Sequence, residues 1–207
     1  MSKAKITLHH GDIAKDVVFQ QSVAVDTETL GLNPLRDRLC VVQLSQGDGS
    51  AHLIQFDGTD YSAPRLKALL SDTRVTKIFH YARFDIAVLK HYLDVSTSPV
   101  YCTKIASKLV RTYTDRHGLK DLCSELIGVE LSKQQQSSDW AAETLSPQQQ
   151  TYAASDVLYL HALKERLDAM LARQGRTEFA AAAYQFLETR ADLDLAGFGE
   201  MDLFGHK

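Results

Sequence analysis

Short apolar runs and alternating apolar and polar positions dominate the first part of the chain, and both patterns predict β-strands. Strands are expected at residues 6–8, 23–25, 39–44 and 51–56. The turn-forming residues 45–50 separate the last two of these runs. Because three successive strands with short connections favour a hairpin-like order, we expect residues 23–56 to form an antiparallel meander.

Beyond residue 60 the apolar positions recur at helical spacing. The pattern predicts helices at residues 63–70, 83–93, 103–112, 118–128, 147–172 and 178–189. It predicts further strands at residues 75–79 and 100–102. Residues 131–146 are polar and glutamine-rich, with Trp140 as the one large anchor, so they form either an ordered loop over a site or a solvated connector. Strands followed by helices indicate an α/β protein.

The composition fits one globular domain. The chain has 207 residues, of which 44% are hydrophobic, and it has no long low-complexity tract. No apolar run approaches the roughly 20 residues that span a bilayer, and the first residues do not resemble a secretory signal. The three cysteines, Cys40, Cys102 and Cys123, are scattered and predict reduced core thiols. We therefore expect a cytoplasmic protein without membrane contact.

The charge distribution limits the nucleic acids that the protein can hold. A net charge of −3 argues against tight binding to long duplexes, which depends on many basic contacts with phosphates. Residues 103–120 are locally basic and form either one cationic surface or a solvated helix face. The basic residues of this segment are Lys104, Lys108, Arg111, Arg116 and Lys120, against the single acid Asp115.

A pair of acids follows the apolar run 23–25. Asp26 and Glu28 are two residues apart, so in an extended strand their side chains point to the same face. Two neighbouring carboxylates repel each other unless a cation lies between them, and oxygen ligands suit hard ions such as Mg²⁺ or Mn²⁺. The alternative is a half-buried strand with an acidic polar face that ends in a turn at Gly31.

Two further clusters strengthen the metal hypothesis. Asp85 falls in the first turn of a predicted helix that follows a buried strand. Tyr152 and Asp156 are four residues apart and share one face of the helix predicted at 147–172. Four carboxylates and a tyrosine, each at a strand end or on a helix, predict a site for two divalent ions that catalyses phosphoryl displacement.

Each member of this set has an expected role. Asp26 is expected to bridge the two ions, Glu28 and Asp156 to complete the ligands of one ion, and Asp85 to hold the other. Tyr152 is expected to orient or deprotonate the attacking water, which requires its hydroxyl within hydrogen-bond reach.

In order and separation, these three clusters resemble the three exonuclease motifs of the DEDD superfamily. The spacing from Tyr152 to Asp156 resembles the DEDDy branch, to which ribonuclease D belongs, and residues 118–122 resemble a further conserved segment of that branch. The resemblance covers roughly residues 20–165. It implies a ribonuclease H-like α/β fold, with a mixed sheet flanked by helices in a single domain, and a metal-dependent 3'-5' exonuclease activity.

Within that family, the sequence is similar to the short nano-RNase C type. The similarity rests on the opening around Asp26 and on residues 102–108 and 132–140, whereas Thr144 stands where ribonuclease D usually has proline. The resemblance implies degradation of short single-stranded RNA, including dinucleotides, to nucleoside 5'-monophosphates, and assembly into a homo-octamer. Because ribonuclease D proper carries further RNA-gripping helical domains that this chain does not have, short substrates are expected.

The predicted division of the chain follows from the same resemblance. Residues 1–172 are expected to form the exonuclease domain. Residues 173–207 are expected to form a helix and an apolar tail that packs on the same domain or on a neighbouring subunit.

Three residues are candidates for substrate binding, each with an alternative. Leu30 is expected to wedge against the terminal bases, or else to be a turn or core leucine. His80 is expected to contact the terminal sugar or a phosphate, or else to be structural. Lys133 is expected to pair with a phosphate, or else to be an ordinary exposed lysine. Alternative functions are 3'-5' digestion of DNA ends, general trimming of RNA 3' ends, and a catalytically inactive nucleic-acid-binding module.

Overall fold

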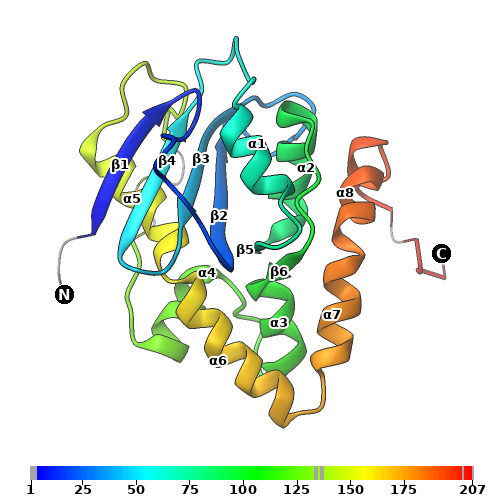
Figure 1. The fold of residues 1–207 in the computed structure, drawn as a ribbon. Coiled ribbons are helices and arrows are strands. Elements are labelled where there is room, and N and C mark those ends of the chain that lie inside the picture. The colour runs from blue at the N-terminus through cyan, green and yellow to red at the C-terminus, as the bar shows by residue number, and fades with distance from the viewer. Residues whose placement is uncertain (1–3, 133–134, 136–137, 202, 207) are drawn as a thin grey trace.

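A six-stranded sheet lies at the centre of the protein (Figure 1). The computed structural model describes residues 4–132, 135, 138–201 and 203–206. The strands are β1 (Lys5–His10), β2 (Ser22–Thr29), β3 (Leu39–Ser45), β4 (Ser50–Gln55), β5 (Thr76–Phe79) and β6 (Val100–Cys102). Their order across the sheet is β1-β4-β3-β2-β5-β6.

The sheet is mixed, and the predicted meander forms its middle. Strands β2, β3 and β4 pair antiparallel, whereas β5 and β6 continue the sheet parallel to β2. Strand β1 pairs parallel with β4 at the far edge, a long-range pairing that no local pattern specifies. The predicted α/β class, with a mixed sheet flanked by helices in one domain, is confirmed.

Helices cover both faces of the sheet. They are α1 (Pro64–Ser71), α2 (Ala82–Leu93), α3 (Thr103–Val110), α4 (Leu119–Leu122), the π-helical turn η1 (Cys123–Ile127), α5 (Pro147–Leu158), α6 (Leu160–Arg173), α7 (Thr177–Gln185) and α8 (Leu187–Leu195). Among the described residues, no helix has the length and apolar character needed to cross a membrane.

The alternation along β2 creates two separate cores. Val25 packs with Leu66 of α1, Ile86 of α2 and Leu187 of α8 on one face of the sheet. Ala24, its neighbour, lies in the core on the other face, with residues of α3, α5, α6 and α7. The period of two in the strand therefore decides which helices each β2 side chain meets.

Two predicted helices are interrupted. The helix expected at 147–172 divides into α5 and α6 at Tyr159, and the one expected at 178–189 divides into α7 and α8 at Phe186. Neither position carries glycine or proline. The partners differ on each side instead: α5 packs on β1 to β4 and α6 on α3, while α8 packs on α2. Tertiary packing therefore set these boundaries.

The basic segment does not form one continuous cationic surface. The Arg111 side chain is 0% exposed, and its guanidinium forms an ion pair with Glu125 and donates to the carbonyl oxygen of Arg116 at 2.6 Å. Arg116 pairs with Asp121 at 2.6 Å. Acids from the following helical segment thus neutralise two of the predicted cations.

Candidate active site

A notch in the sheet exposes the acid pair. Strand β5 pairs with β2 only from Ser22 to Ala24, so the rest of β2 is open on that side. After β5 the chain turns through His80 and Tyr81 into α2. The start of α2 therefore lies beside the part of β2 that carries the acids.

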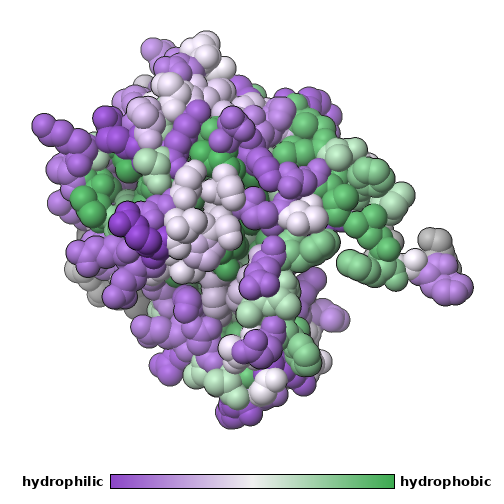
Figure 2. All heavy atoms as spheres, turned by 45° about the vertical axis from the view of Figure 1, so that its right-hand side comes forward, coloured by the Kyte–Doolittle hydropathy of each residue, from purple (hydrophilic) through white to green (hydrophobic). Residues whose placement is uncertain are grey.

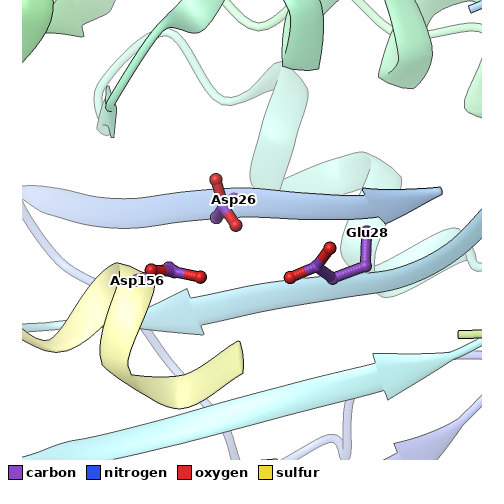
Figure 3. Close-up of side chains that lie close together, drawn as sticks. All are labelled: Asp26, Glu28 and Asp156. Carbon is purple, nitrogen blue, oxygen red and sulfur yellow. The ribbon is translucent and has the colours of Figure 1, made fainter. Parts of the chain in front are cut away.

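Three carboxylates meet on the face of β2 that α5 covers. Asp26 and Glu28 project on the same side as Ala24, and Asp156 reaches them from α5 (Figure 3). One oxygen of each carboxylate lies within 4.8 Å of an oxygen of the other two. Helix α5 is fixed at its start by a capping box, in which the Ser146 hydroxyl accepts the Gln149 backbone N–H at 3.2 Å.

Asp85 reaches the site from the opposite face of the sheet. Its carboxylate is 3% exposed and accepts a hydrogen bond from the Thr27 hydroxyl at 2.7 Å. Thr27 lies between the two acids of β2, so its side chain points toward α2 while theirs point toward α5. Thr27 is not among the site residues predicted from the sequence, although a hydroxyl between two acids is the signal that identifies it.

Burial raises the pKa of all four carboxyl groups, and repulsion from neighbouring acids raises it further in three of them. Burial raises the pKa of Asp26 to about 7. Burial, followed by repulsion from Asp26, Asp156 and Asp85, raises the pKa of Glu28 to about 10. Burial and the charge of Asp26 also raise the pKa of Asp85 and of Asp156.

No cation of the described chain balances these acids. None of the lysine, arginine and histidine side chains that the structure describes forms an ion pair with any of the four carboxylates. Clustered carboxylate oxygens are the ligands that hard divalent ions prefer. The donor set therefore fits Mg²⁺ or Mn²⁺, whose charge would offset the mutual repulsion.

A cavity of about 660 Å³ opens over the carboxylates. Its lining includes Asp26, Glu28, Leu30, His80, Tyr81, Asp85, Lys120, Trp140, Tyr152 and Asp156. Tyr152 lies one turn before Asp156, and its ring is 6.0 Å, between centroids, from that of Trp140, which is buried. Burial and the three nearby carboxylates raise the pKa of Tyr152, so the phenol keeps its proton at neutral pH.

His80 presents an unprotonated ring nitrogen within the site. Its Nδ1 lies 2.9 Å from the Thr103 hydroxyl, which itself donates to the Phe79 carbonyl oxygen at 3.1 Å. With the threonine proton assigned to that bond, the consistent tautomer carries its proton on Nδ1 and leaves Nε2 as an acceptor. Burial, with a contribution from Lys104, lowers the pKa of His80 to about 3, so the ring is neutral.

Leu30 stands at the mouth of the cavity and is 52% exposed. The loop that carries it is ordered by Asp37, whose carboxylate accepts the Asn33 backbone N–H at 2.9 Å. A Cβ on Gly31 would lie 2.3 Å from an Asp37 oxygen, so a side chain at this position would displace the Asp37 carboxylate. Lys133 lies outside the described residues.

Residues 10–172 match the 3'-5' exonuclease family, so the chain belongs to that family. Over nearly its whole length it is similar to Brucella melitensis NrnC, at 59% identity and a TM-score of 0.96, with 98% of this chain and 99% of that chain covered. NrnC has also been solved with bound Mg²⁺ and bound to pGG, each 57% identical to this chain. The predicted resemblance is confirmed.

The chain is also similar to ribonuclease D proteins, but the match covers less than half of each of them. Ribonuclease D of Acidiphilium cryptum is 38% identical over 160 residues, which cover 77% of this chain and 40% of that protein. Escherichia coli RNase D is 28% identical, with a TM-score of 0.74, and the match covers 83% of this chain and 45% of that chain. This chain thus spans about two fifths of the length of the curated ribonuclease D relative.

Proposed function

We propose that this protein is a metal-dependent 3'-5' exoribonuclease that degrades short single-stranded RNA, including dinucleotides, to nucleoside 5'-monophosphates. The observation that carries the proposal is a group of four carboxylates that line a 660 Å³ cavity and form no ion pair with a described side chain. Membership in the 3'-5' exonuclease family supports the reaction. The structures of NrnC with Mg²⁺ and with pGG support the metal and the small substrate.

The carboxylates have distinct proposed roles. Asp26, Glu28 and Asp156 would hold one divalent ion, and Asp26 with Asp85 a second. When bound, two such ions stabilise the attacking and leaving oxygens of an in-line phosphoryl displacement. Thr27 holds Asp85 in place through its hydrogen bond.

Tyr152 is proposed to orient the attacking water rather than to deprotonate it. Its raised pKa, caused by burial and by the three nearby carboxylates, keeps the hydroxyl protonated and able to donate a hydrogen bond. Trp140 packs beside its ring and restricts where the hydroxyl can point.

Leu30 and His80 are proposed to position the end of the RNA. The exposed Leu30 side chain would wedge against a terminal base. The unprotonated Nε2 of His80 can accept a hydrogen bond from a ribose hydroxyl, since Thr103 fixes the proton on Nδ1. We also propose Lys133 as a phosphate contact, from the sequence alone.

Time courses on end-labelled RNAs of two to about twenty nucleotides test the proposal most directly. We expect Mg²⁺- or Mn²⁺-dependent release of nucleoside 5'-monophosphates, with dinucleotides turned over fastest and no turnover in EDTA. Activity that survives chelation would contradict the metal-dependent mechanism. Faster digestion of the longest RNAs would favour the general trimming enzyme.

Matched DNA oligonucleotides separate the remaining alternatives. Equal rates on RNA and DNA would show that the ribose 2'-hydroxyl is not required and would favour digestion of DNA ends. Absence of turnover on every substrate, despite binding, would favour an inactive binding module.

We propose that copies of this chain associate through the C-terminal segment, with an octamer as the expected assembly. Helices α7 and α8 pack on the domain, but an apolar surface remains beside the C-terminal end (Figure 2). The exposed large apolar residues of the C-terminal segment are Phe179, Phe186, Phe198, Met201, Leu203 and Phe204. Mass determination in solution, with Phe179→Glu and Phe204→Glu as variants, tests this: a monomeric wild type would contradict it.

A cytoplasmic location is proposed from the cysteines. Cys40, Cys102 and Cys123 are all free and buried in the structure. Buried free thiols fit a reducing compartment. Fractionation of cells that express the protein tests the location.

A further inference from the structure

An aromatic side chain stands in water at the wall of the cavity. Tyr81 is 47% exposed and lines the same cavity as the carboxylates, four residues before Asp85. Large aromatic residues usually bury their rings or use them in recognition. The proposed roles of the four carboxylates, Tyr152, Leu30 and His80 do not involve this ring.

The backbone at Tyr81 holds the ring in this position. Tyr81 is the N-cap of α2 and adopts φ 71° and ψ 42°, in the left-handed region that tyrosine rarely occupies. The residues Phe79 and Ala82 on either side of the turn are completely buried. The chain thus passes from one buried element to another through an unfavourable conformation that points the large side chain outward, and such outliers cluster at binding sites.

A lysine lies against the ring. The Lys104 Nζ atom, in the first turn of α3, is 4.3 Å from the centroid of the Tyr81 ring, within the range of a cation–π contact. Within the described part of the chain, no carboxylate lies within 4.0 Å of this ammonium group. Tyr81 lines the cavity and Lys104 does not, so the lysine supports the ring from outside the cavity.

We propose that Tyr81 is a stacking platform for a nucleobase of the substrate, with Lys104 holding the ring from behind. The proposal rests on the proposed function, because the carboxylates of the same cavity would fix the scissile phosphate through their metal ions. A base is the part of a short RNA that offers a flat π-face, and stacking on an aromatic side chain tolerates any base. The stacking platform would thus add affinity for short RNA of any base sequence.

Binding of pGG in Ca²⁺, measured by calorimetry, tests the platform with three variants. Tyr81→Asn removes the ring but suits the left-handed backbone, since asparagine tolerates this region better than tyrosine. We expect its Kd to rise about tenfold, at the low end for loss of one stacked base. Tyr81→Phe keeps the ring and is expected to keep the wild-type Kd. Lys104→Gln is expected to weaken binding by a smaller factor, whereas Lys108→Gln, one turn later on the exposed face of α3, is expected to change nothing.

Two abasic analogues of pGG, each lacking one base, distinguish stacking from a structural effect. If Tyr81 stacks on a base, the wild type and Tyr81→Asn bind equally well to the analogue that lacks that base. An unchanged Kd for pGG in Tyr81→Asn would overturn the proposal. So would an equal loss on pGG and on both analogues, because the substitution would then act through the fold.

The same measurements separate this inference from the proposed function. If the wild-type protein binds pGG in Ca²⁺ but releases no nucleotide in Mg²⁺ or Mn²⁺, the proposed exoribonuclease activity is refuted. The comparison with Tyr81→Asn would still decide whether Tyr81 stacks on a base. If the wild-type protein hydrolyses pGG and Tyr81→Asn leaves the Kd for pGG unchanged, the proposed activity stands and the stacking role of Tyr81 is refuted. Wild-type protein that does not bind pGG would refute the platform directly.

Discussion

Acids that are largely shielded from water occur in two regions of this protein with opposite surroundings. At the junction of α2 and α8, Asp194 accepts hydrogen bonds from Arg83 through both of its oxygens at 2.6 Å, and Arg190 donates to it at 2.5 Å. In the cavity, Asp26 and its three acidic neighbours meet no described cation. The pKa of Asp194 is lowered by the hydrogen bonds from its arginines, which outweigh the opposing effect of burial, whereas burial raises the pKa of Asp26 to about 7.

The two regions adjoin on a single helical turn. Arg83 and Asp85 are two residues apart at the start of α2, and one joins the ion-pair network while the other joins the cavity. Removing an acid that is paired with cations of its own chain destabilises the fold, because those cations lose their partner. Acids that have no such cation destabilise the metal-free protein. Their presence therefore indicates that a bound metal ion supplies the positive charge. Pairing, rather than burial, distinguishes the structural acid from the candidate ligand.

The largest expected effect is on turnover in Asp26→Asn. We expect hydrolysis of pGG to fall roughly 10³-fold or more, because the proposed bridging ligand is lost. The melting temperature in EDTA at or above neutral pH is expected to stay the same or rise, since the substitution removes a carboxyl group whose ionisation burial opposes.

Asp194→Asn is the matched control for that experiment. It is expected to lower the free energy of unfolding by about 1–3 kcal/mol, because two arginines lose their partner, and to leave turnover nearly unchanged at a temperature where the protein stays folded. A metal-free Asp26→Asn protein that melts earlier than Asp194→Asn would break the distinction between the two regions.

Tyr152→Phe is expected to have the next largest effect. The loss of the hydroxyl that orients water should lower kcat about 10²-fold, with little change in the Kd for pGG, since the ring and its packing on Trp140 remain. Single-turnover rates and binding measured in Ca²⁺ check the two quantities separately. An unchanged kcat would remove Tyr152 from the mechanism.

The local features of the site were predictable because each depends on one short pattern. The period of two in β2 put Asp26 and Glu28 on one face, and the helical period put Tyr152 one turn from Asp156. The helix predicted from residue 147 begins there, as α5, with Pro147 in its first turn and Ser146 as its cap. The family resemblance then supplied the relation between segments that no local pattern contains.

Features that depend on contacts between distant segments were not predictable. Thr27 acquires its role only because α2 brings Asp85 to the opposite face of β2. Arg111 was grouped with exposed cations, but Glu125 and the loop carbonyl of Arg116 enclose it. The break at Tyr159 arises where the packing partners of the helix change. In each case a residue far along the chain decides the outcome.

Metal binding is expected to stabilise the wild type and not Asp26→Asn. At a concentration of Mg²⁺ about 100 times Kd, linkage adds about 2.7 kcal/mol to the free energy of unfolding, which corresponds to a rise of roughly 5–10 °C in melting temperature for a chain of this size. Asp194→Asn should show the same rise from a lower starting point. A rise of equal size in Asp26→Asn would place the metal elsewhere.

The smallest expected effect is the dependence of metal-free stability on pH, and it has opposite signs in the two regions. The folded-state pKa of Asp26 is raised to about 7 and that of Glu28 to about 10, so the folded protein keeps protons that the unfolded chain releases above about pH 4. Their contribution to stability is therefore complete at low pH and is lost as the pH rises through 7 and toward 10.

Asp194, with its lowered pKa, contributes in the other direction, since its contribution is present at neutral pH and is lost only as the solution becomes acidic. Between pH 5 and 8 in EDTA, the melting temperature should thus change with a more negative slope in the wild type than in Asp26→Asn, and with the wild-type slope in Asp194→Asn. Histidines whose pKa is lowered by burial, such as His80 and His161, add the same positive contribution to the slope in all three proteins. Saturating Mg²⁺ should make the wild-type slope less negative, because the metal binds the deprotonated carboxylates. Equal slopes of melting temperature against pH in EDTA for the wild type and Asp26→Asn would show that the cavity acids are already ionised without metal. The two regions would then differ in their arginine partners but not in the pKa values of their acids.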